Sequence, residues 1–377
     1  MNRFRQHSHM AAKIALGVTL TAGVAWPGAA PASASTSAPA GRCTPVAGVT
    51  TTDLGTLGGP GTVAFDLNDR GVVVGVSDTD IPTPTVTSHA FRWREGVMVD
   101  MTPTADYGVA SDVNDRGEIL FRENDASGEQ MAIWSRRTTT PLPGYATAIN
   151  DRGEALLNNA VWRRETVTDI LPPDPDHWVV ATGLGSRGHV VGTVWPFPGP
   201  GGGHPPHDGA FVWRDGTMTV IRVPGLFMPT PVGVDRTGRV LLQAVGDGGT
   251  RAVLSDGVDH VVLPSLTGAP DASTTAGDIN DRGDAVGSSV AASGAQHAVL
   301  WRDGRVIDLH ALGTSSVATA IGPNGHVAGT YVAADGTTRA FLWWCGRMTD
   351  IGDGGVPITV NARGQVLFNS TLVTPTR

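Results

Sequence analysis

The chain has 377 residues and a formal net charge of -8, from 35 acidic and 27 basic side chains. Lys13 is its only lysine, so everything after the N-terminal segment lacks the residue that Schiff-base chemistry requires. The acidic balance argues against a nucleic-acid partner, because such partners bind basic patches.

The N-terminal segment, residues 1–34, has the pattern of a secretory signal peptide. Arg3, Arg5 and Lys13 form a basic start, an apolar run covers residues 14–26, and small residues near 30–34 provide cleavage sites. The apolar run is too short to span a membrane, and no other segment of the chain approaches that length. We therefore expect a secreted protein with neither a membrane span nor a lipid anchor.

The remainder of the chain divides into two parts. Residues 35–48 read as a linker that contains Cys43, and residues 49–377 read as a single domain built from repeats. Removal of the signal peptide takes away three positive charges and no negative ones, so the mature protein is more acidic than the full chain.

A turn of the form Asn-x-x-Gly recurs along the domain. Five copies lie at 68–71, 114–117, 150–153, 280–283 and 361–364, and degenerate copies lie at 185–188, 235–238 and 322–325. Their spacing of 35 to 50 residues is typical of radial or stacked repeat proteins. Glycine closes all eight turns because it adopts a left-handed backbone without a Cβ clash, and Asn or Asp in the first position can bond its own backbone. The pattern predicts eight tight β-hairpins.

A second hairpin follows most of these turns. Its first strand starts with alanine and in six copies reaches a tryptophan, which we interpret as core: Trp93, Trp134, Trp162, Trp213, Trp301 and Trp343. Two hairpins make a small antiparallel sheet that cannot bury both of its faces alone. Small residues in the strand before each turn suit the crowded centre of a radial array. We therefore predict an all-β fold, a β-propeller of about eight four-stranded blades.

The two ends of the domain complement one another. Residues 49–57 match a fourth strand that lacks the three strands before it, whereas residues 358–377 supply three strands and then stop. We predict that the N-terminal strand closes the last blade, which removes exposed sheet edges. Cys43 and Cys345, the two cysteines, fall at the same end of this closure. We expect them to form a disulfide in an oxidising compartment.

The repeat also resembles a known sequence pattern. The His-Ala-Phe at 89–91, its variants at 297–299 and 339–341, the Asp-Leu-Gly-Thr-Leu-Gly-Gly segment at 53–59 and the Asn-Asp-Arg-Gly turns are similar to the HAF repeat of predicted bacterial extracellular proteins. The resemblance covers roughly residues 50–377. It implies an extracellular repeat protein and no established chemistry, so it supplies no catalytic residues.

Longer and more variable loops are expected on the face opposite the tight turns, where binding residues concentrate. The loop at 195–209 of the fourth repeat and the interblade loop at 172–178, expected beside it, gather the candidate ligand-binding residues Asp174, Asp176, His177, Trp178, Trp195, Phe197, His204 and His207, with Asp208 next to them. Exposed aromatic rings suit a sugar or a peptide, and His with Asp suits a cation. The alternative is a solvated Pro/Gly loop with incidental histidines. We predict neither a metal site nor a cofactor.

A second candidate lies at the centre of the ring. Asp66, Asp112 and Asp278 share one register on innermost strands, and they would form a weak acidic ring if they faced the channel. By contrast, His89 and His297, and the aspartates at the ends of the fourth strands, recur with the repeat, so we interpret them as structural.

Two functions remain open at this stage. The first is a secreted, non-enzymatic binding or interaction module whose extracellular ligand is a glycan, a peptide or a cell-surface polymer. The second is a secreted glycan-active hydrolase or lyase with its site at the opening of the propeller, an analogy that rests on fold alone. The chain contains no catalytic motif that favours the second, and nothing in it indicates the oligomeric state.

Overall fold

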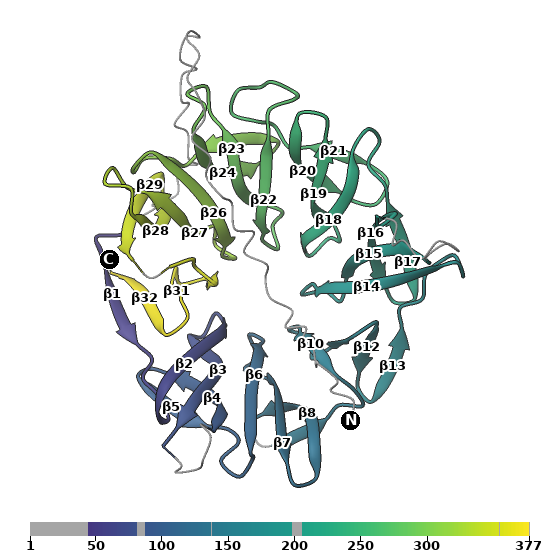
Figure 1. Ribbon diagram of the computed structural model, residues 1–377, viewed down its shortest axis with the longest axis vertical. Coiled ribbons are helices and arrows are strands. Elements are labelled where there is room, and N and C mark those ends of the chain that lie inside the picture. The colour runs from purple at the N-terminus through teal and green to yellow at the C-terminus, as the bar shows by residue number, and fades with distance from the viewer. Residues whose placement is uncertain (1–43, 81–86, 137, 198–205, 354, 377) are drawn as a thin grey trace, which may run out of the picture.

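The computed structural model describes residues 44–80, 87–136, 138–197, 206–353 and 355–376. They form eight antiparallel sheets, each of four strands, arranged in a ring around a central axis (Figure 1). The predicted all-β propeller with eight blades is confirmed. None of the described segments forms a helix that could cross a membrane. The predicted signal peptide lies outside the described residues.

Blades one to four follow one another along the chain, and each runs from its innermost to its outermost strand. Blade one contains β2 (Gly58–Leu67), β3 (Val72–Thr79), β4 (Ser88–Arg94) and β5 (Val97–Asp100); blade two contains β6 (Tyr107–Val113), β7 (Ile119–Asp125), β8 (Gly128–Ser135) and β9 (Thr138–Pro141); blade three contains β10 (Ala146–Ile149), β11 (Ala155–Leu157), β12 (Ala160–Arg163) and β13 (Thr166–Asp169); blade four contains β14 (His177–Leu184), β15 (Val190–Pro196), β16 (Gly209–Arg214) and β17 (Thr217–Ile221).

Blades five to eight continue in the same order, except that the last blade takes its outermost strand from the beginning of the domain. Blade five contains β18 (Phe227–Val234), β19 (Val240–Gly246), β20 (Gly249–Ser255) and β21 (His260–Val262); blade six contains β22 (Thr274–Ile279), β23 (Ala285–Val290), β24 (Gln296–Arg302) and β25 (Arg305–Asp308); blade seven contains β26 (Ser315–Ile321), β27 (Val327–Val332), β28 (Thr338–Trp344) and β29 (Arg347–Gly352); blade eight contains β30 (Thr359–Val360), β31 (Val366–Leu367), β32 (Thr371–Thr376) and β1 (Gly48–Asp53).

Closure of the ring takes place as predicted. Strand β1 pairs antiparallel with β32, with Gly48 opposite Thr376 and Asp53 opposite Thr371. The closing strand ends at Asp53, four residues before the predicted end at residue 57. Because the first and last strands share one sheet, the ring cannot open without breaking this strand pair.

The eight predicted tight turns all form. Each closing glycine has a φ between 74° and 96°, and its N–H donates to the carbonyl oxygen of the first turn residue at 2.9–3.1 Å. The turns therefore have the left-handed geometry that made glycine the expected residue.

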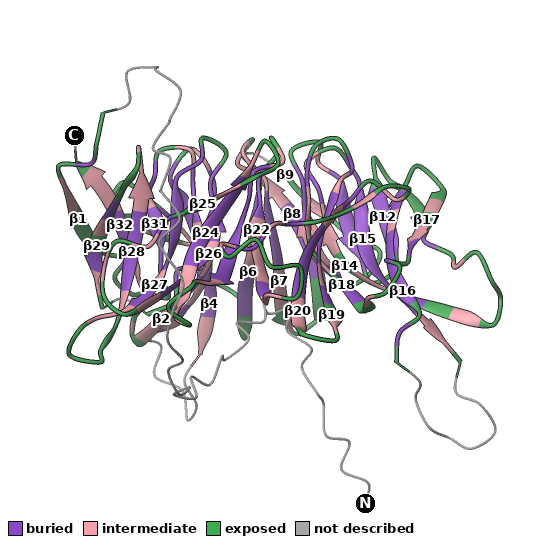
Figure 2. Ribbon diagram, turned by 90° about the horizontal axis from the view of Figure 1, so that it is seen from above, coloured by how far each residue is buried: buried purple, intermediate pink, exposed green. Residues whose placement is uncertain are grey.

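The core lies between adjacent blades. Val74 and Ala90 of blade one, for example, pack against Ile119 and Phe121 of blade two. Figure 2 shows buried residues along the strands and exposed residues in the loops at both ends of the ring. Four repeat tryptophans are buried, and those of blades two and seven are partly buried against the core, so the core interpretation is confirmed: Trp93, Trp162, Trp213 and Trp301 are buried, and Trp134 and Trp343 are partly buried.

The repeat histidines have structural partners on the same blade. His89 Nδ1 lies 2.7 Å from a carboxylate oxygen of Asp100, at the end of the fourth strand. His297 pairs with Asp308 in the same way at 2.9 Å. The structural interpretation of both residue positions is therefore confirmed.

The predicted disulfide involves a residue outside the described part of the chain, Cys43. Cys345 lies in the turn between β28 and β29, and its Sγ is 3.8 Å from the carbonyl oxygen of Thr44. Thr44, the residue that follows Cys43 in the sequence, therefore lies beside Cys345. The disulfide stays a prediction.

Candidate functional site

The end of the β14–β15 hairpin carries a stack of aromatic rings. Trp178 and Trp195 are cross-strand partners, with ring centroids 5.7 Å apart and planes at 25°. His207 packs against the other tryptophan, Trp195, at 5.3 Å and 58°. Trp178 is 38 % exposed, and nearby Phe197 is 54 % exposed. Large rings left in solvent at this level are typical of binding surfaces.

A charged network lies at the same end of the hairpin, around His177, the residue before Trp178 on β14. His177 Nδ1 is 3.5 Å from Asp174, and His177 Nε2 is 3.6 Å from Asp208. Arg222 donates a hydrogen bond to the Asp208 carboxylate. That hydrogen bond holds the pKa of Asp208 below its usual value, so the carboxylate is ionised at neutral pH. We call these residues, with Trp178, Trp195, Phe197 and His207, the blade-four patch.

Backbone hydrogen bonds hold the patch in place. The N–H of His177 donates to the carbonyl oxygen of Asp174, and the N–H of Phe197 donates to that of Asp176. The Asp174 carboxylate accepts the N–H of Asp176 at 3.0 Å, which closes the loop before β14. The aromatic residues thus stand on a fixed hairpin end.

The structure brings together most of the predicted site residues. Asp174, His177, Trp178, Trp195, Phe197 and His207 lie in one cluster, as the sequence pattern suggested. His204 lies outside the described residues. Among the described residues, the Asp176 side chain makes no hydrogen bond or ion pair. No group of three or more His, Cys, Asp or Glu residues in the described ranges is arranged to hold a metal ion.

Two contributors were missed from the sequence. Arg222 pairs with Asp208, and Thr230 Oγ1 on β18 lies 3.4 Å from His207 Nε2. The strand register could have indicated Arg222, because the antiparallel pairing of Ala210 with Ile221 brings Arg222 opposite Gly209, the residue after Asp208. Thr230 belongs to the next blade and had no sequence signal.

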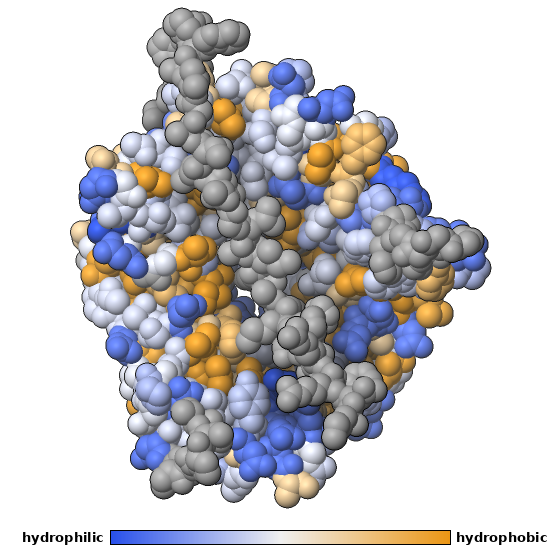
Figure 3. All heavy atoms as spheres, in the orientation of Figure 1, coloured by the Kyte–Doolittle hydropathy of each residue, from blue (hydrophilic) through white to orange (hydrophobic). Residues whose placement is uncertain are grey.

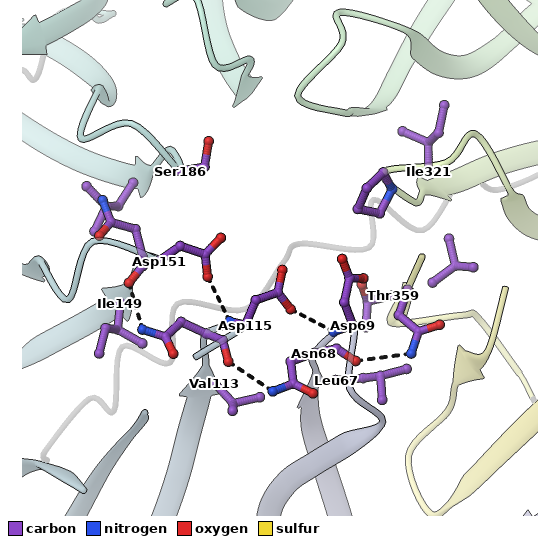
Figure 4. Close-up of a pocket in the computed structure, with 16 residues that line it drawn as sticks. Leu67, Asn68, Asp69, Val113, Asp115, Ile149, Asp151, Ser186, Ile321 and Thr359 are labelled. Carbon is purple, nitrogen blue, oxygen red and sulfur yellow. Dashed lines mark hydrogen bonds between the residues drawn. The ribbon is translucent and has the colours of Figure 1, made fainter. Parts of the chain in front are cut away.

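The second candidate site lies at the centre of the ring. On the face with the Asn-x-x-Gly turns, a cavity of about 280 Å³ is bounded by apolar residues that include Leu67, Val113, Ile149 and Ile321. Figure 3 shows apolar side chains beside the central opening on the face that it presents. Asp69, Asp115 and Asp151 stand at the rim of this cavity (Figure 4).

The rim aspartates join neighbouring blades. Asp115 accepts the N–H of Asp69 at 2.7 Å, and Asp151 accepts the N–H of Asp115 at the same distance. Burial, together with the negative charge of Asp69, raises the pKa of Asp115. Burial also raises the pKa of Asp151, with contributions from the charges of Asp115 and Asp281. The rim is therefore an acidic crescent whose charges oppose one another.

Turn asparagines make a second set of bonds between blades. Their Nδ2 groups donate to the next blade: Asn68 to the carbonyl oxygen of Asn114 (2.9 Å), Asn114 to Asn150 (2.8 Å), Asn150 to Gly185 (3.1 Å), Asn280 to Gly322 (3.2 Å) and Asn361 to Asn68 (3.0 Å). The last bond links blade eight to blade one. This role was missed from the sequence. The first turn position holds Asn, Asp or Gly, and of these only Asn has a side-chain amide that can donate a hydrogen bond.

Asp66, Asp112 and Asp278, which the sequence suggested as a possible acidic ring, make hydrogen bonds between neighbouring blades. Their carboxylates accept the N–H groups of Val113, Ile149 and Ile321, at 3.0, 2.7 and 3.0 Å, from the next innermost strand. Asp66 and Asp112 both contact the Val113 N–H. Burial and the charge of Asp66 raise the pKa of Asp112 well above its usual value. These groups hold the channel wall together.

Comparisons with known proteins concern the fold. No protein-family model and no curated protein matches the chain. Among solved structures, the β-propeller domain of the Trilobed protease from Pyrococcus furiosus is similar at 12 % identity and a TM-score of 0.46, over 77 % of this chain and 98 % of that one. YCF48 bound to D1 peptide has 13 % identity and a TM-score of 0.45, over 87 % and 95 %. Pyrococcus horikoshii acylaminoacyl peptidase has 13 % identity and a TM-score of 0.43, over 78 % and 52 %.

Proposed function

We propose that this protein is a secreted, non-enzymatic binding module of the HAF-repeat type that recognises an extracellular ligand through the blade-four patch. The observation that carries the proposal is the Trp178–Trp195 stack, whose outer ring is 38 % exposed next to a 54 % exposed Phe197. Every Å² of apolar ring surface left in water costs about 25 cal/mol relative to the same surface when buried. Burial of these rings against a ligand would recover that energy.

The rigid ring supports a binding role. The hairpin that carries the patch belongs to a closed ring, so the patch is ordered before a ligand arrives. Preorganised sites lose little conformational entropy on binding. The centre of the ring supports a role without catalysis, because the carboxylates of Asp66, Asp112 and Asp278 accept hydrogen bonds from backbone N–H groups.

The test is a binding screen of the mature protein against cell-wall polymers, soluble glycans and peptides. The double variant Trp178→Ala/Phe197→Ala should lose binding, whereas the control Tyr145→Ala should not, because Tyr145 is a similarly exposed ring (41 %) on blade three. Binding that survives the double variant would refute the patch as the site. Cleavage of any polymer in the screen would refute the non-enzymatic role and favour the hydrolase or lyase.

A further inference from the structure

We infer that the ligand of the blade-four patch is a neutral oligosaccharide, whose sugar ring stacks on Trp178. The inference rests on the proposed function, because it names the chemical class that the patch would bind. A pyranose has an apolar face of C–H groups and a rim of hydroxyls. A matching site therefore needs a flat aromatic surface next to groups that both donate and accept hydrogen bonds.

The aromatic surface has the required arrangement. Trp195 stacks on the Trp178 ring, and His207 packs against Trp195 at a tilt of 58°, so the three rings form one aromatic cluster. Trp195 is further held by a 2.8 Å hydrogen bond from its Nε1 to Thr193. Burial lowers the pKa of His207, so its ring is neutral at neutral pH and packs as an apolar group. The exposed part of Trp178 is thus held at a fixed angle.

The polar groups of the patch supply both kinds of hydrogen-bonding partner. Arg222 offers N–H donors and Asp208 offers carboxylate acceptors, and their side chains are 58 % and 36 % exposed. His177 lies within 3.6 Å of the same carboxylate. A pair of vicinal hydroxyls can donate to a carboxylate and accept from a guanidinium at once, and charged partners make the stronger hydrogen bonds.

Charge selects against acidic ligands. The patch contains Asp174 and Asp208, with Asp176 in the same loop, and one arginine, Arg222, so carboxylates outnumber the guanidinium group. A uronic acid, a phosphate or a teichoic-acid-like polymer would meet like charge at close range, where repulsion costs affinity. A neutral glycan escapes this penalty.

Backbone pairing disfavours an extended peptide. A bound peptide strand presents an N–H and a carbonyl group at each residue and pairs best with an open strand edge. At the end of the hairpin the backbone groups that β14 and β15 turn toward each other already pair, with His177 opposite Pro196, and the Phe197 N–H bonds to the Asp176 carbonyl oxygen. Side chains are what this surface offers to a ligand.

The apolar surface continues onto blade five, which favours an oligosaccharide over a single sugar. Thr230 contacts His207, so the start of β18 lies next to the patch. Phe227 and Met228, in the same stretch of β18, are 64 % and 45 % exposed. Three residues of strand span about 10 Å, a distance that accommodates a second sugar ring.

The test is isothermal titration calorimetry of the mature protein with defined probes. These are cellotetraose, chitotetraose, xylotetraose and mannotetraose as neutral ligands, tetragalacturonate as an acidic one, and a proline-rich peptide. We expect binding of at least one neutral tetrasaccharide. Trp178→Ala and Asp208→Asn should each weaken it about tenfold or more, Trp178→Phe should weaken it less, and Tyr145→Ala should leave it unchanged.

The outcomes separate this inference from the proposed function. Binding of the acidic glycan or the peptide in place of the neutral probes, with loss in Trp178→Ala, would overturn the carbohydrate inference and leave the binding module standing. Neutral-glycan binding that Trp178→Ala does not alter would overturn the placement on this patch. Failure of every probe and of the wider polymer screen would overturn both. Far-ultraviolet circular dichroism of each variant serves as the folding control.

Discussion

The asparagine bonds between blades lead to a specific stability prediction, centred on Asn114. Its side chain is buried (5 % exposed) and makes four hydrogen bonds. Oδ1 accepts the N–H groups of Arg116 and Glu118, at 3.1 and 2.9 Å. Nδ2 donates to the carbonyl oxygen of Asn150 on blade three at 2.8 Å, and to the Glu118 carboxylate at 2.6 Å. The amide thus closes its own turn and joins two blades.

Asn114→Asp keeps the two accepted bonds and removes the two donated ones. The lost bond to Asn150 is worth about 1 kcal/mol, and the lost bond to the Glu118 carboxylate adds to that cost. The new carboxylate would also face Glu118 in a site shielded from water, which repels further. We expect the free energy of unfolding to fall by about 2–4 kcal/mol.

Blade five provides the rescue. Its first turn residue is Asp235, and the residue that corresponds to Glu118 is Arg239, whose Nε donates to the Asp235 carboxylate at 2.8 Å. The double variant Asn114→Asp/Glu118→Arg copies this pair into blade two. It should recover about half of the lost stability, because the charge repulsion disappears while the bond to blade three stays absent.

Urea denaturation followed by tryptophan fluorescence measures these changes. The control is Asn124→Ala on the same blade, an exposed residue whose loss should change stability by less than about 0.5 kcal/mol. If Asn114→Asp is as stable as the control, the interblade bond has no role in stability. If the double variant is no more stable than Asn114→Asp, the charge argument is wrong.

Three further predictions concern closure, charge and packing. If the predicted disulfide closes the ring, Cys345→Ser should lower the free energy of unfolding by about 2–4 kcal/mol, and reductant should have the same effect on the wild type. Equal melting temperatures of the variant and the wild type would contradict the pairing. Burial and the charge of Asp69 raise the pKa of Asp115, so between the unfolded-state pKa of 3.8 and the higher folded-state pKa the folded state holds more protons than the unfolded state. Stability falls as pH rises through this window, and the loss is complete above it. Asp115→Asn should therefore raise the melting temperature at pH 7 but not at pH 3, and a uniform shift would reject this reasoning. Gly75→Ala would place a Cβ 2.1 Å from a backbone oxygen and should cost about 3 kcal/mol in urea unfolding, whereas Gly144→Ala meets no atom within 4 Å and should be near neutral.

Much of the fold was readable from the chain because its determinants are local. A turn glycine such as Gly283 needs its left-handed φ whatever surrounds it, and its spacing from the next copy sets the blade length. Closure followed from counting strands at the two ends of the domain. The buried position of Trp301 followed from its recurrence in the repeat.

The candidate site was predictable only in outline. Trp178 and Trp195 stood in neighbouring variable loops, so their proximity followed from the hairpin, but the side chains that surround them did not. Thr230 reaches His207 from the next blade. Sequence spacing carries no information on such a contact, because it depends on how two sheets pack.

The sequence by itself determined the number of blades, the order of the strands and the closure of the ring, because turn chemistry and strand alternation act within a few residues. The tertiary structure decided what the polar residues of the channel do. Asp112 could have faced water as part of an acidic ring, yet its carboxylate accepts the N–H of Ile149 on the next blade. The amide of Asn361 likewise reaches Asn68 across 293 positions of sequence. Each partner is set by the angle between adjacent sheets, a property of the closed ring that no single repeat contains.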